Sequence, residues 1–381
     1  MAPRTTLPAR AGLRRGYGRA MASPLTTLLP GTRALLAVAV STSLLIGSGA
    51  LAVDASSRPL DGVAEPSSAF INDAPLIQRG KMALGVSMPR SRDLSQLDAF
   101  SASIGGNKPA MWSIWSQWGS AKTQEFPTAV MNGLRDRRVV PFIFWEPVDP
   151  DRLMDPAFAY ERISAGDHDA YIRRFARDAK SFGGLVLLRF AGEANGAYFP
   201  WGMGGPLANT AKSYKQAWRH IWSIFDARGA DNVRFVWSMV KQRCPGGCNP
   251  YTAFYPGSRY VDYMAFSSYN WGAISDKAWA GMYKGYRRVV KHLASISRKP
   301  ILAAETGTNH VGGDKAVWIR KGYRKVYNEL PRVMAVMYLN YDVGFLGHPD
   351  WSMSSSGGGL GAYEKIARLS GFKGKLTLKG S

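Results

Sequence analysis

Eight short apolar runs, separated by segments with helical periodicity, are the feature of this sequence that most restricts its fold. The runs lie at residues 82–87, 109–114, 139–145, 185–191, 233–238, 263–268, 300–304 and 333–338. Runs of this length fit strands that are buried on both faces of a parallel sheet. Several of the segments between them repeat apolar residues every three or four positions, which predicts helices that cover such a sheet. One such helix, with its apolar stripe over residues 171–182, has Asp167 as its candidate N-cap and Gly183-Gly184 as its stop.

The regular alternation predicts an α/β protein with a single catalytic domain, a (β/α)8 TIM barrel. The repeats extend over roughly 290 residues, a usual size for this fold. An open, doubly wound sheet is the alternative, but no Gly-rich phosphate loop follows the first run. Of the 381 residues, 46% are apolar, which is enough for a large core.

The first 52 residues have the features of an export signal. Arginines without any acidic residue precede an apolar run at 34–46, and small residues follow up to Ala52. We therefore expect a signal peptide over 1–52, a linker over 53–79, the barrel over 80–371 and a solvated basic tail over 372–381. An uncleaved membrane anchor is the alternative, because the apolar stretch is close to spanning length. Either way the expected location is extracellular.

The chain is strongly basic, and removal of the expected signal does not change this. The formal charge is +22, and subtracting the six arginines of residues 1–52 leaves +16. Such a field favours acidic polymers or surfaces. No cationic run alternates with aromatic residues and no nucleic-acid-binding motif occurs, so nucleic acid is not expected as a partner. We expect a monomer without a membrane partner after signal cleavage.

Two of the apolar runs are followed by a glutamate and a Gly-containing loop. Glu193 follows the fourth run and Glu305 the seventh. The carboxyl ends of all strands meet at one mouth of a barrel, so both carboxyl groups are expected to reach one cleft. Paired carboxylates in a cleft are the minimal equipment for hydrolysis of a glycosidic bond. A cap on the following turn is the alternative role for Glu193.

The chemistry of such a pair requires two different protonation states. A general acid must hold its proton, so burial and the charge of Glu305 are expected to raise the pKa of Glu193. Glu305 must remain ionised. Arg189 precedes Glu193 by four residues, so on strand alternation both point into the barrel, where Arg189 could pair with Glu305. An ion pair elsewhere in the barrel is the alternative for Arg189.

Aromatic side chains gather at the predicted strand ends, where an indole could stack on a sugar ring. They are Trp112, Trp115, Trp118, Trp145, Tyr198, Trp201, Trp271 and Trp351. Each could instead belong to the core. Glu146 and Asp342 also end strands, and we expect them to bind substrate hydroxyls rather than to act as the catalytic acid.

The cysteines and histidines indicate neither a metal site nor a cofactor. Cys244 and Cys248 bracket a Pro-Gly-Gly turn, and in an exported chain such a pair predicts a disulfide that pins a loop. The five histidines are widely separated in the sequence. We expect no metal and no cofactor.

The segment 189–196, RFAGEANG, with Trp201 after it, resembles the R-x-x-H-E-x-N-G motif of glycoside hydrolase family 26. Further matches follow in order over residues 81–371: Trp145-Glu146-Pro147, Tyr255-Pro256-Gly257, Val261-Asp262, Tyr269-Asn270-Trp271-Gly272, Lys299-Pro300-Ile301 with Glu305 and Gly307, and Asp350-Trp351. The family consists largely of β-mannanases, built as barrels whose acid/base ends strand four and whose nucleophile ends strand seven.

The resemblance implies a retaining, endo-acting hydrolase of β-linked polysaccharide, mannan foremost, with Glu193 as acid/base and Glu305 as nucleophile. It also implies a set of substrate-binding residues: Arg189, Asn195, Trp201, Tyr269, Trp271, Trp145, Glu146 and Trp351. Within this set, Tyr269 is the candidate hydrogen-bond donor to Glu305.

In one position the chain departs from the family. Gly192 stands where the family usually has a histidine that helps to bind the sugar beside the scissile bond. The alternatives to a mannanase are the same mechanism on a β-glucan, a β-xylan or a bacterial exopolysaccharide, and a carbohydrate-binding barrel that has lost turnover.

Overall fold

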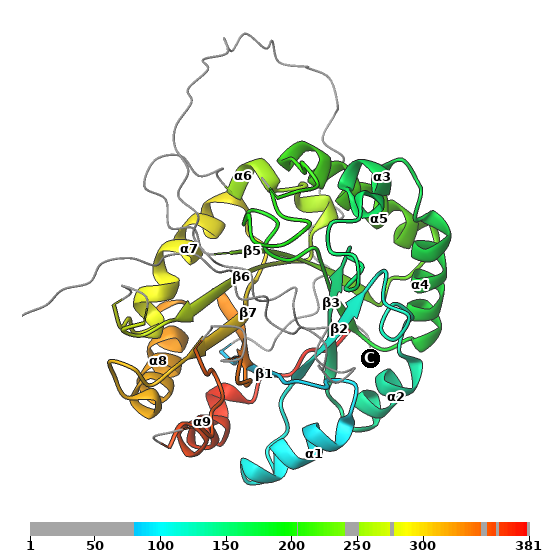
Figure 1. Ribbon diagram of the computed structural model, residues 1–381. Helices are drawn as coiled ribbons and strands as arrows, with labels where there is room; N and C mark the ends of the chain where they lie inside the picture. The colour runs from blue at the N-terminus through cyan, green and yellow to red at the C-terminus, as the bar shows by residue number, and fades with distance from the viewer. Residues whose placement is uncertain are drawn as a thin grey trace, which may run out of the picture.

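The predicted barrel is confirmed by the computed structural model, which describes residues 80–203, 205–240, 251–274, 278–343, 349–355 and 358–378. Eight parallel strands close in sequence order, each paired with the next and the last with the first. Figure 1 looks along the barrel and shows the helices as a ring outside the strands.

Each strand overlaps one of the eight predicted runs. They are β1 Ala83–Ser87, β2 Met111–Gln117, β3 Val140–Glu146, β4 Val186–Phe190, β5 Val233–Val240, β6 Tyr263–Asn270, β7 Ile301–Thr308 and β8 Val333–Leu339. Nearly all of their residues are buried, because one face of the barrel lines its interior and the other lies under the helices.

The helices of the described residues are α1 Leu94–Ser103, α2 Thr128–Asp136, α3 Tyr160–Ser164, α4 Asp169–Phe182, α5 Ala211–Ala227, α6 Tyr251–Phe254, α7 Met282–Ile296, α8 Lys315–Glu329 and α9 Gly359–Ala367. The predicted stop of α4 is confirmed, since Gly183 takes the left-handed conformation at φ 70°. The predicted N-cap Asp167 is wrong, because His168 occupies that position.

Strict alternation along the strands divides the core into two layers. Phe142, Phe144, Leu187, Ala265 and Leu302 belong to the cluster inside the barrel. Their neighbours on the same strands pack outward against the apolar stripes of the helices, in a second and larger cluster. The side of the strand that a residue occupies therefore decides whether it can reach the mouth of the barrel.

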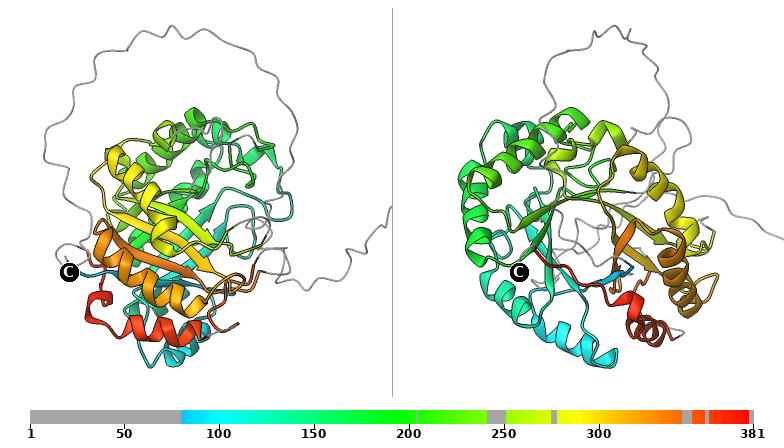
Figure 2. Two further views of the ribbon diagram at one scale, coloured as in Figure 1. Left: turned by 90° about the vertical axis from the view of Figure 1, so that its left-hand side faces the viewer. Right: turned by 180° about the vertical axis from the view of Figure 1, so that it is seen from behind.

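The C-terminal tail is not solvated as expected, because part of it is buried against the barrel. Leu376 is 6% exposed and belongs to the cluster inside the barrel, and the Gly374 N–H donates to the Met82 carbonyl at 3.0 Å. The right-hand view of Figure 2 shows this last segment, in red, crossing the end of the barrel. Residues 372–378 therefore close the barrel instead of leaving it, because Phe372 and Leu376 are apolar residues among the lysines.

Several expectations concern residues outside the described ranges. These are the signal peptide at 1–52, the linker at 53–79 and the disulfide between Cys244 and Cys248. Within the described ranges, no helix combines the length and the apolar character needed to cross a membrane.

Candidate active site

Alternation along β3 places a carboxyl group at the mouth and a tryptophan behind it. Phe142 and Phe144 face the barrel interior, so Glu146 at the end of the strand does too. Trp145 must then point outward, where it is fully buried and its Nε1 donates to Tyr171 Oη at 2.8 Å. The predicted contact of Trp145 with substrate is wrong for this reason.

A bulge in β7 brings Glu305 inside. Leu302 and Ala304 face the interior, so regular alternation would turn the next residue, Glu305, toward the helices. The pairing with β6 skips one residue here, because Phe266 is opposite Ala303 whereas the next residue of β6 is opposite Glu305. The bulge therefore re-aims the Glu305 side chain into the mouth.

Glu193 reaches the same mouth from a turn. β4 ends at Phe190, and Ala191 and Glu193 have left-handed backbones with φ of 44° and 62°. Such values are uncommon for residues with a side chain, and they collect at functional sites. The Glu193 N–H donates to the Ser238 carbonyl at 2.9 Å, which helps to hold the turn. The predicted convergence of Arg189 and Glu193 is thus confirmed. Strand alternation explains the direction of Arg189, whereas Glu193 is directed by the turn.

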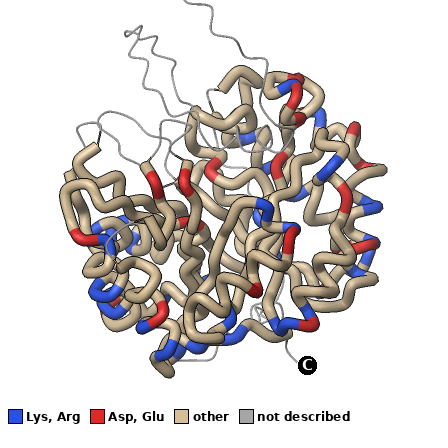
Figure 3. Tube along the Cα trace, turned by 60° about the horizontal axis from the view of Figure 1, so that its bottom comes forward, with Lys and Arg blue, Asp and Glu red and all other residues tan. Residues whose placement is uncertain are grey.

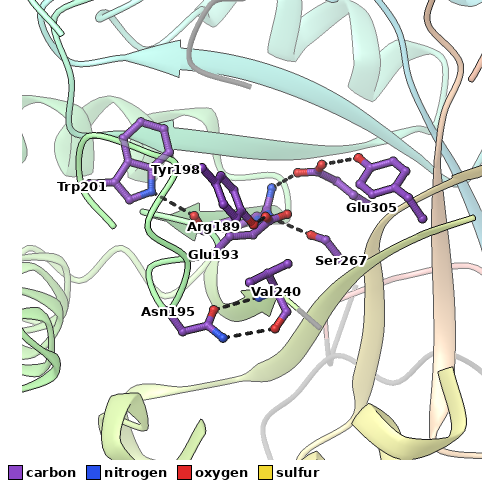
Figure 4. A network of polar contacts seen from close by, with 10 residues as sticks. Arg189, Glu193, Asn195, Tyr198, Trp201, Val240, Ser267 and Glu305 are labelled. Carbon is purple, nitrogen blue, oxygen red and sulfur yellow. Dashed lines mark hydrogen bonds and ion pairs between the residues drawn. The ribbon is translucent and has the colours of Figure 1, made fainter. Parts of the chain in front are cut away.

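Arg189 lies between the two glutamates (Figure 4). Its Nη1 donates to Glu305 Oε1, and its Nη2 contacts Glu193 Oε1 at 3.4 Å and donates to Ser267 Oγ at 3.2 Å. Arg189 and both glutamates are 4–5% exposed. One guanidinium therefore fixes both carboxyl groups in a site from which water is largely excluded.

The surroundings of Glu193 favour its protonated form. Burial raises the pKa of Glu193, and the nearby charge of Glu305 raises it further, while Arg189 acts in the opposite direction. The Tyr198 hydroxyl donates to Glu193 Oε2. A carboxyl group with a raised pKa in a cleft has the property that a general acid needs.

Glu305 accepts hydrogen bonds from two donors. Besides Arg189, the Tyr269 hydroxyl donates to Glu305 Oε2 at 2.5 Å, which confirms the predicted contact. Trp351 packs against the Tyr269 ring with centroids 5.0 Å apart, and Trp271 lies edge-on to Trp351 at 5.6 Å. Trp351 is only 2% exposed, so in this structure it supports Tyr269 and offers no face to a sugar.

Glu146 is a third buried carboxyl group at this mouth. It accepts a hydrogen bond from Gln117 Nε2 at 3.1 Å. Burial raises the pKa of Glu146 to about 8, an effect that the hydrogen bond from Gln117 and the charge of Arg189 only partly offset. At neutral pH Glu146 therefore keeps its proton and can donate as well as accept a hydrogen bond.

The segment after β4 is fixed by Asn195 and Trp201. Asn195 Nδ2 donates to the Val240 carbonyl at 3.1 Å, and its Oδ1 accepts from the Val240 N–H at 2.9 Å. Trp201 Nε1 donates to the Gly192 carbonyl at 2.9 Å. Asn195 therefore braces this segment through its amide, and its predicted contact with substrate stays a prediction.

A pocket opens over two of the three carboxyl groups, Glu146 and Glu305, and over Arg189. Its lining comprises Trp115, Phe144, Glu146, Arg189, Gly192, Phe199, Trp201 and Glu305. Trp115 also lines an adjoining pocket with Met88, Pro89, Leu339 and Tyr341. Of the aromatic residues noted at strand ends, Trp115 and Trp201 therefore border this cleft, whereas Trp112 and Trp118 are core residues at 0% and 3% exposure.

The structure explains why glycine occupies position 192. A Cβ added to Gly192 would overlap the Arg189 guanidinium. Histidine at this position would therefore require Arg189 to move away from the two glutamates. The Arg189 Nε has no hydrogen-bond partner among the described residues, and it lies in a side chain that lines the pocket. This donor is buried against Gly192, and the close packing leaves it without a partner in the described part of the chain.

Three contributors to the site were not assigned these contacts from the sequence: Tyr198, Ser267 and Gln117. Ser267 lies two residues before Tyr269 on β6, so strand alternation could have placed it beside Glu305. Gln117 ends β2 opposite Glu146. The path that brings Tyr198 back to Glu193 runs through consecutive turns and carries no comparable signal. Among the described residues, no group of His, Cys, Asp and Glu could hold a metal ion.

Comparison with known proteins finds a family that part of this chain resembles. Residues 167–321 match the model of glycosyl hydrolase family 26, a range that includes Arg189, Glu193, Tyr269 and Glu305. Endoglucanase H of Acetivibrio thermocellus is 35% identical over 226 residues, 58% of this chain and 24% of that protein. Mannan endo-1,4-beta-mannosidase A and B of Caldalkalibacillus mannanilyticus is 35% identical over 92 residues, 23% of this chain and 17% of that protein. The matches thus span a quarter or less of these relatives.

Solved structures share the barrel. A mannanase of Bacillus subtilis superposes with a TM-score of 0.55 at 18% identity, over 81% of this chain and 90% of the other. The values for a β-mannanase of Bacteroides ovatus are 0.55 and 15%, over 79% and 91%. Identities this low show the shared fold alone. Together, these findings show that residues 167–321 are similar to glycosyl hydrolase family 26 and that the shared barrel extends over most of the chain.

Proposed function

We propose that this protein is a retaining, endo-acting glycoside hydrolase that cleaves a β-linked polysaccharide. The observation that carries the proposal is the contact of one guanidinium with two buried carboxyl groups of different surroundings. Glu305 has cationic and hydroxyl donors, which suits a nucleophile, whereas burial raises the pKa of Glu193, which suits a proton donor.

The reaction follows from these roles. Glu305 attacks the anomeric carbon while Glu193 gives its proton to the leaving glycosidic oxygen, so one C–O bond forms as the other breaks. Glu193, now ionised, then removes a proton from water, and the resulting oxygen nucleophile displaces Glu305 from the sugar. Each glutamate returns to its starting state, and the anomeric configuration is retained.

Retention is supported by the arrangement around Arg189. Its two terminal nitrogens contact Glu193 and Glu305, so the carboxyl groups are separated by little more than one guanidinium. Retaining enzymes have carboxyl groups roughly 5–5.5 Å apart, whereas inverting enzymes need roughly 6.5–9.5 Å to admit a water. The bridged geometry therefore favours direct attack by Glu305.

A polymeric substrate is supported by the two adjoining pockets that share Trp115. They lie along the mouth from Glu146 and Glu305 to the ends of β1 and β8, so the pocket-lined surface continues beyond Glu305. We propose mannan as the first candidate, because one sequence relative is named a mannan endo-1,4-beta-mannosidase and several similar structures are described as mannanases.

A β-glucan is the second candidate, and a specific observation favours it. The relative with the longer match, 226 residues, is named an endoglucanase. Gly192 is compatible with this candidate, since the histidine that usually binds the sugar beside the scissile bond is absent and Arg189 fills the space.

The experiment that tests the proposal is the release of reducing ends from a panel of mannan, mixed-linkage β-glucan, cellulose and xylan. The matched control is Glu305→Gln, which preserves the shape of the site. Proton NMR of freshly released product gives the anomeric configuration before mutarotation. Binding without release from any polymer would contradict the proposal, and inverted product would contradict the role of Glu305.

We also propose that the protein is secreted after cleavage near residue 52. The support is the order of arginines, apolar run and small residues in 1–52. N-terminal sequencing of protein recovered from the culture medium tests this, and an intact N-terminus in the membrane fraction would contradict it.

A further inference from the structure

The lysines and arginines on the outer surface of the barrel differ in whether they have acidic partners. Among the described residues, those without acidic partners are concentrated on two neighbouring helices, α7 and α8. α7 presents Lys284, Arg287, Arg288 and Lys291 to solvent, and α8 presents Lys321, Arg324 and Lys325. We call these seven residues the basic face. Figure 3 shows lysines and arginines along the helix-covered outside of the barrel, on which these two helices lie.

The spacing of the basic face makes two parallel ridges. On α7 the cations occupy positions i, i+3, i+4 and i+7, opposite the buried stripe that includes Met282, Tyr286 and Val289. Lys325 of α8 lies over the Tyr283 ring of α7 at 4.9 Å, which brings the second ridge beside the first. The α7 ridge is about 10 Å long, and the Cβ atoms of neighbouring cationic residues on it are about 5–6 Å apart.

Very little negative charge balances these cations. α7 contains no acidic residue, and the acidic residue of α8 is Glu329, which contacts Lys325 at 3.5 Å. For the other six cations, the described residues contain no ion pair. Close, unbalanced like charges destabilise a folded protein through their mutual repulsion. Such a cluster is therefore a candidate for a functional surface.

The opposite side of the barrel carries similar cations that are neutralised. On α3 and α4, Arg162 pairs with Asp167 at 2.5 Å and Arg173 pairs with Asp169 at 2.9 Å. Arg174 and Arg177 have acidic partners at 3.0 Å as well. The basic face is thus a local feature and not a general consequence of composition.

We propose that the basic face docks a linear polysaccharide that carries carboxylate groups. A polymer with one charge per sugar unit repeats its charge at intervals comparable with the spacing of the ridges, and arginine binds carboxylate in a fork geometry. Among the described residues, the exposed large apolar side chains are Met154 and Val311, and neither belongs to α7 or α8. The face therefore lacks the apolar anchors of membrane-surface helices. Its aromatic ring, Tyr283, is partly buried and is covered by Lys325, so the face offers no row of stacking platforms of the kind typical of single-stranded nucleic acid sites.

The position of the face relates docking to the cleft. α7 begins shortly after β6, and Ala280, two residues before the helix, donates its N–H to Asn270 Oδ1 at 2.9 Å, beside Trp271. The α7 ridge therefore runs from the rim of the mouth down the side of the barrel. A docked acidic polymer would hold the cleft next to the matrix that contains it, whichever neutral glycan is cleaved.

The test measures binding of polygalacturonate by affinity electrophoresis at several salt concentrations, in the Glu305→Gln background so that hydrolysis plays no part. The variant replaces Lys284, Arg287, Arg288 and Lys291 with glutamine. The matched control replaces Arg162, Arg173, Arg174 and Arg177, an equal change of net charge on two adjacent helices. Fully methyl-esterified polygalacturonate is the uncharged ligand control.

We expect the α7 variant to bind at least about tenfold more weakly at low salt, with a shallower dependence on salt, because fewer counterions are displaced. The control variant should stay within about twofold of the parent. In the active enzyme, both sets should leave hydrolysis of a short neutral substrate unchanged.

Equal weakening by both sets would overturn the proposal, because net charge alone would then explain binding. So would absence of binding by the parent, binding that survives esterification, or stronger binding to single-stranded DNA or to anionic lipid vesicles. Binding is measured without turnover, so its failure and a failure of the proposed hydrolase activity can be distinguished.

Discussion

Glu193 and Glu305 are equally buried, at 5% exposure each, yet their surroundings differ. Glu305 accepts from Arg189 and Tyr269, whereas Glu193 accepts from Tyr198 and has a longer contact of 3.4 Å with Arg189. Both lie at the carboxyl end of a strand, so burial and position do not distinguish them. In the proposed mechanism, the hydrogen-bond donors therefore distinguish the two carboxyl groups.

The largest expected effect comes from replacing either of the two carboxyl groups by an amide. Glu305→Gln should lower kcat by about 10⁴-fold or more, because no covalent intermediate can form. Glu193→Gln should cost about 10²–10⁴-fold on a polysaccharide, the size of a general-acid contribution. With an aryl glycoside whose leaving group needs no proton, Glu193→Gln should still show a burst of released aglycone, and Glu305→Gln should not. A burst with Glu305→Gln would reverse the two assignments.

The fold could be predicted from the sequence because its determinants are local and repeated. Each strand is a continuous apolar run, and α4, α5, α7 and α8 each carry an apolar stripe at helical spacing. The tail was mispredicted because its lysines dominate the composition, while burial follows from Phe372 and Leu376 alone.

The site was predictable only where a strand end delivers the residue. Arg189, Glu146 and Tyr269 face inward by alternation, and the same rule, applied to Trp145, would have excluded it from the cleft. The aim of Glu305 depends on a bulge, and that of Glu193 on two left-handed residues. The bulge in β7 has no sequence signal here. The left-handed turn has none either, because its residues Ala191 and Glu193 are not glycines. These two side chains were placed correctly by their position after a strand, although their orientation has another cause.

The next effect in size concerns the group that joins the two glutamates. Arg189→Lys keeps the charge but removes the planar fork, so it cannot contact Glu193, Glu305 and Ser267 together. We expect kcat to fall about 100-fold with folding preserved, as measured on the preferred polymer and by circular dichroism. Arg189→Met, which leaves buried carboxylates unpaired, should also lower the free energy of unfolding by about 3–5 kcal/mol. Near-normal activity in Arg189→Lys would show that charge alone suffices.

Glu146 extends the comparison to a carboxyl group held by a neutral amide. Because burial raises its pKa to about 8, the folded protein keeps a proton that the unfolded chain releases above roughly pH 4.5. Stability should therefore decrease as the pH rises from about 5 to 8, by on the order of a few kcal/mol from this group. Glu146→Gln should lessen the decrease, as seen in Tm across this range. The exposed Glu161→Gln is the control, and an unchanged slope in Glu146→Gln would contradict the assignment.

The smallest expected effect separates the two tyrosines. Tyr198→Phe removes a donor that stabilises the ionised form of Glu193, so the pKa of Glu193 should rise further. A general acid works below its pKa, and the alkaline limb of the kcat/KM profile should therefore move upward by about one pH unit, the equivalent of one charge-assisted hydrogen bond. The rate at the optimum should fall less than about tenfold. Tyr269→Phe is the matched variant, because it removes the same hydroxyl from Glu305. Its alkaline limb should stay in place, because Tyr269 donates to Glu305 and not to Glu193. If both variants moved the same limb, the two glutamates would not have the separate roles that their donors indicate.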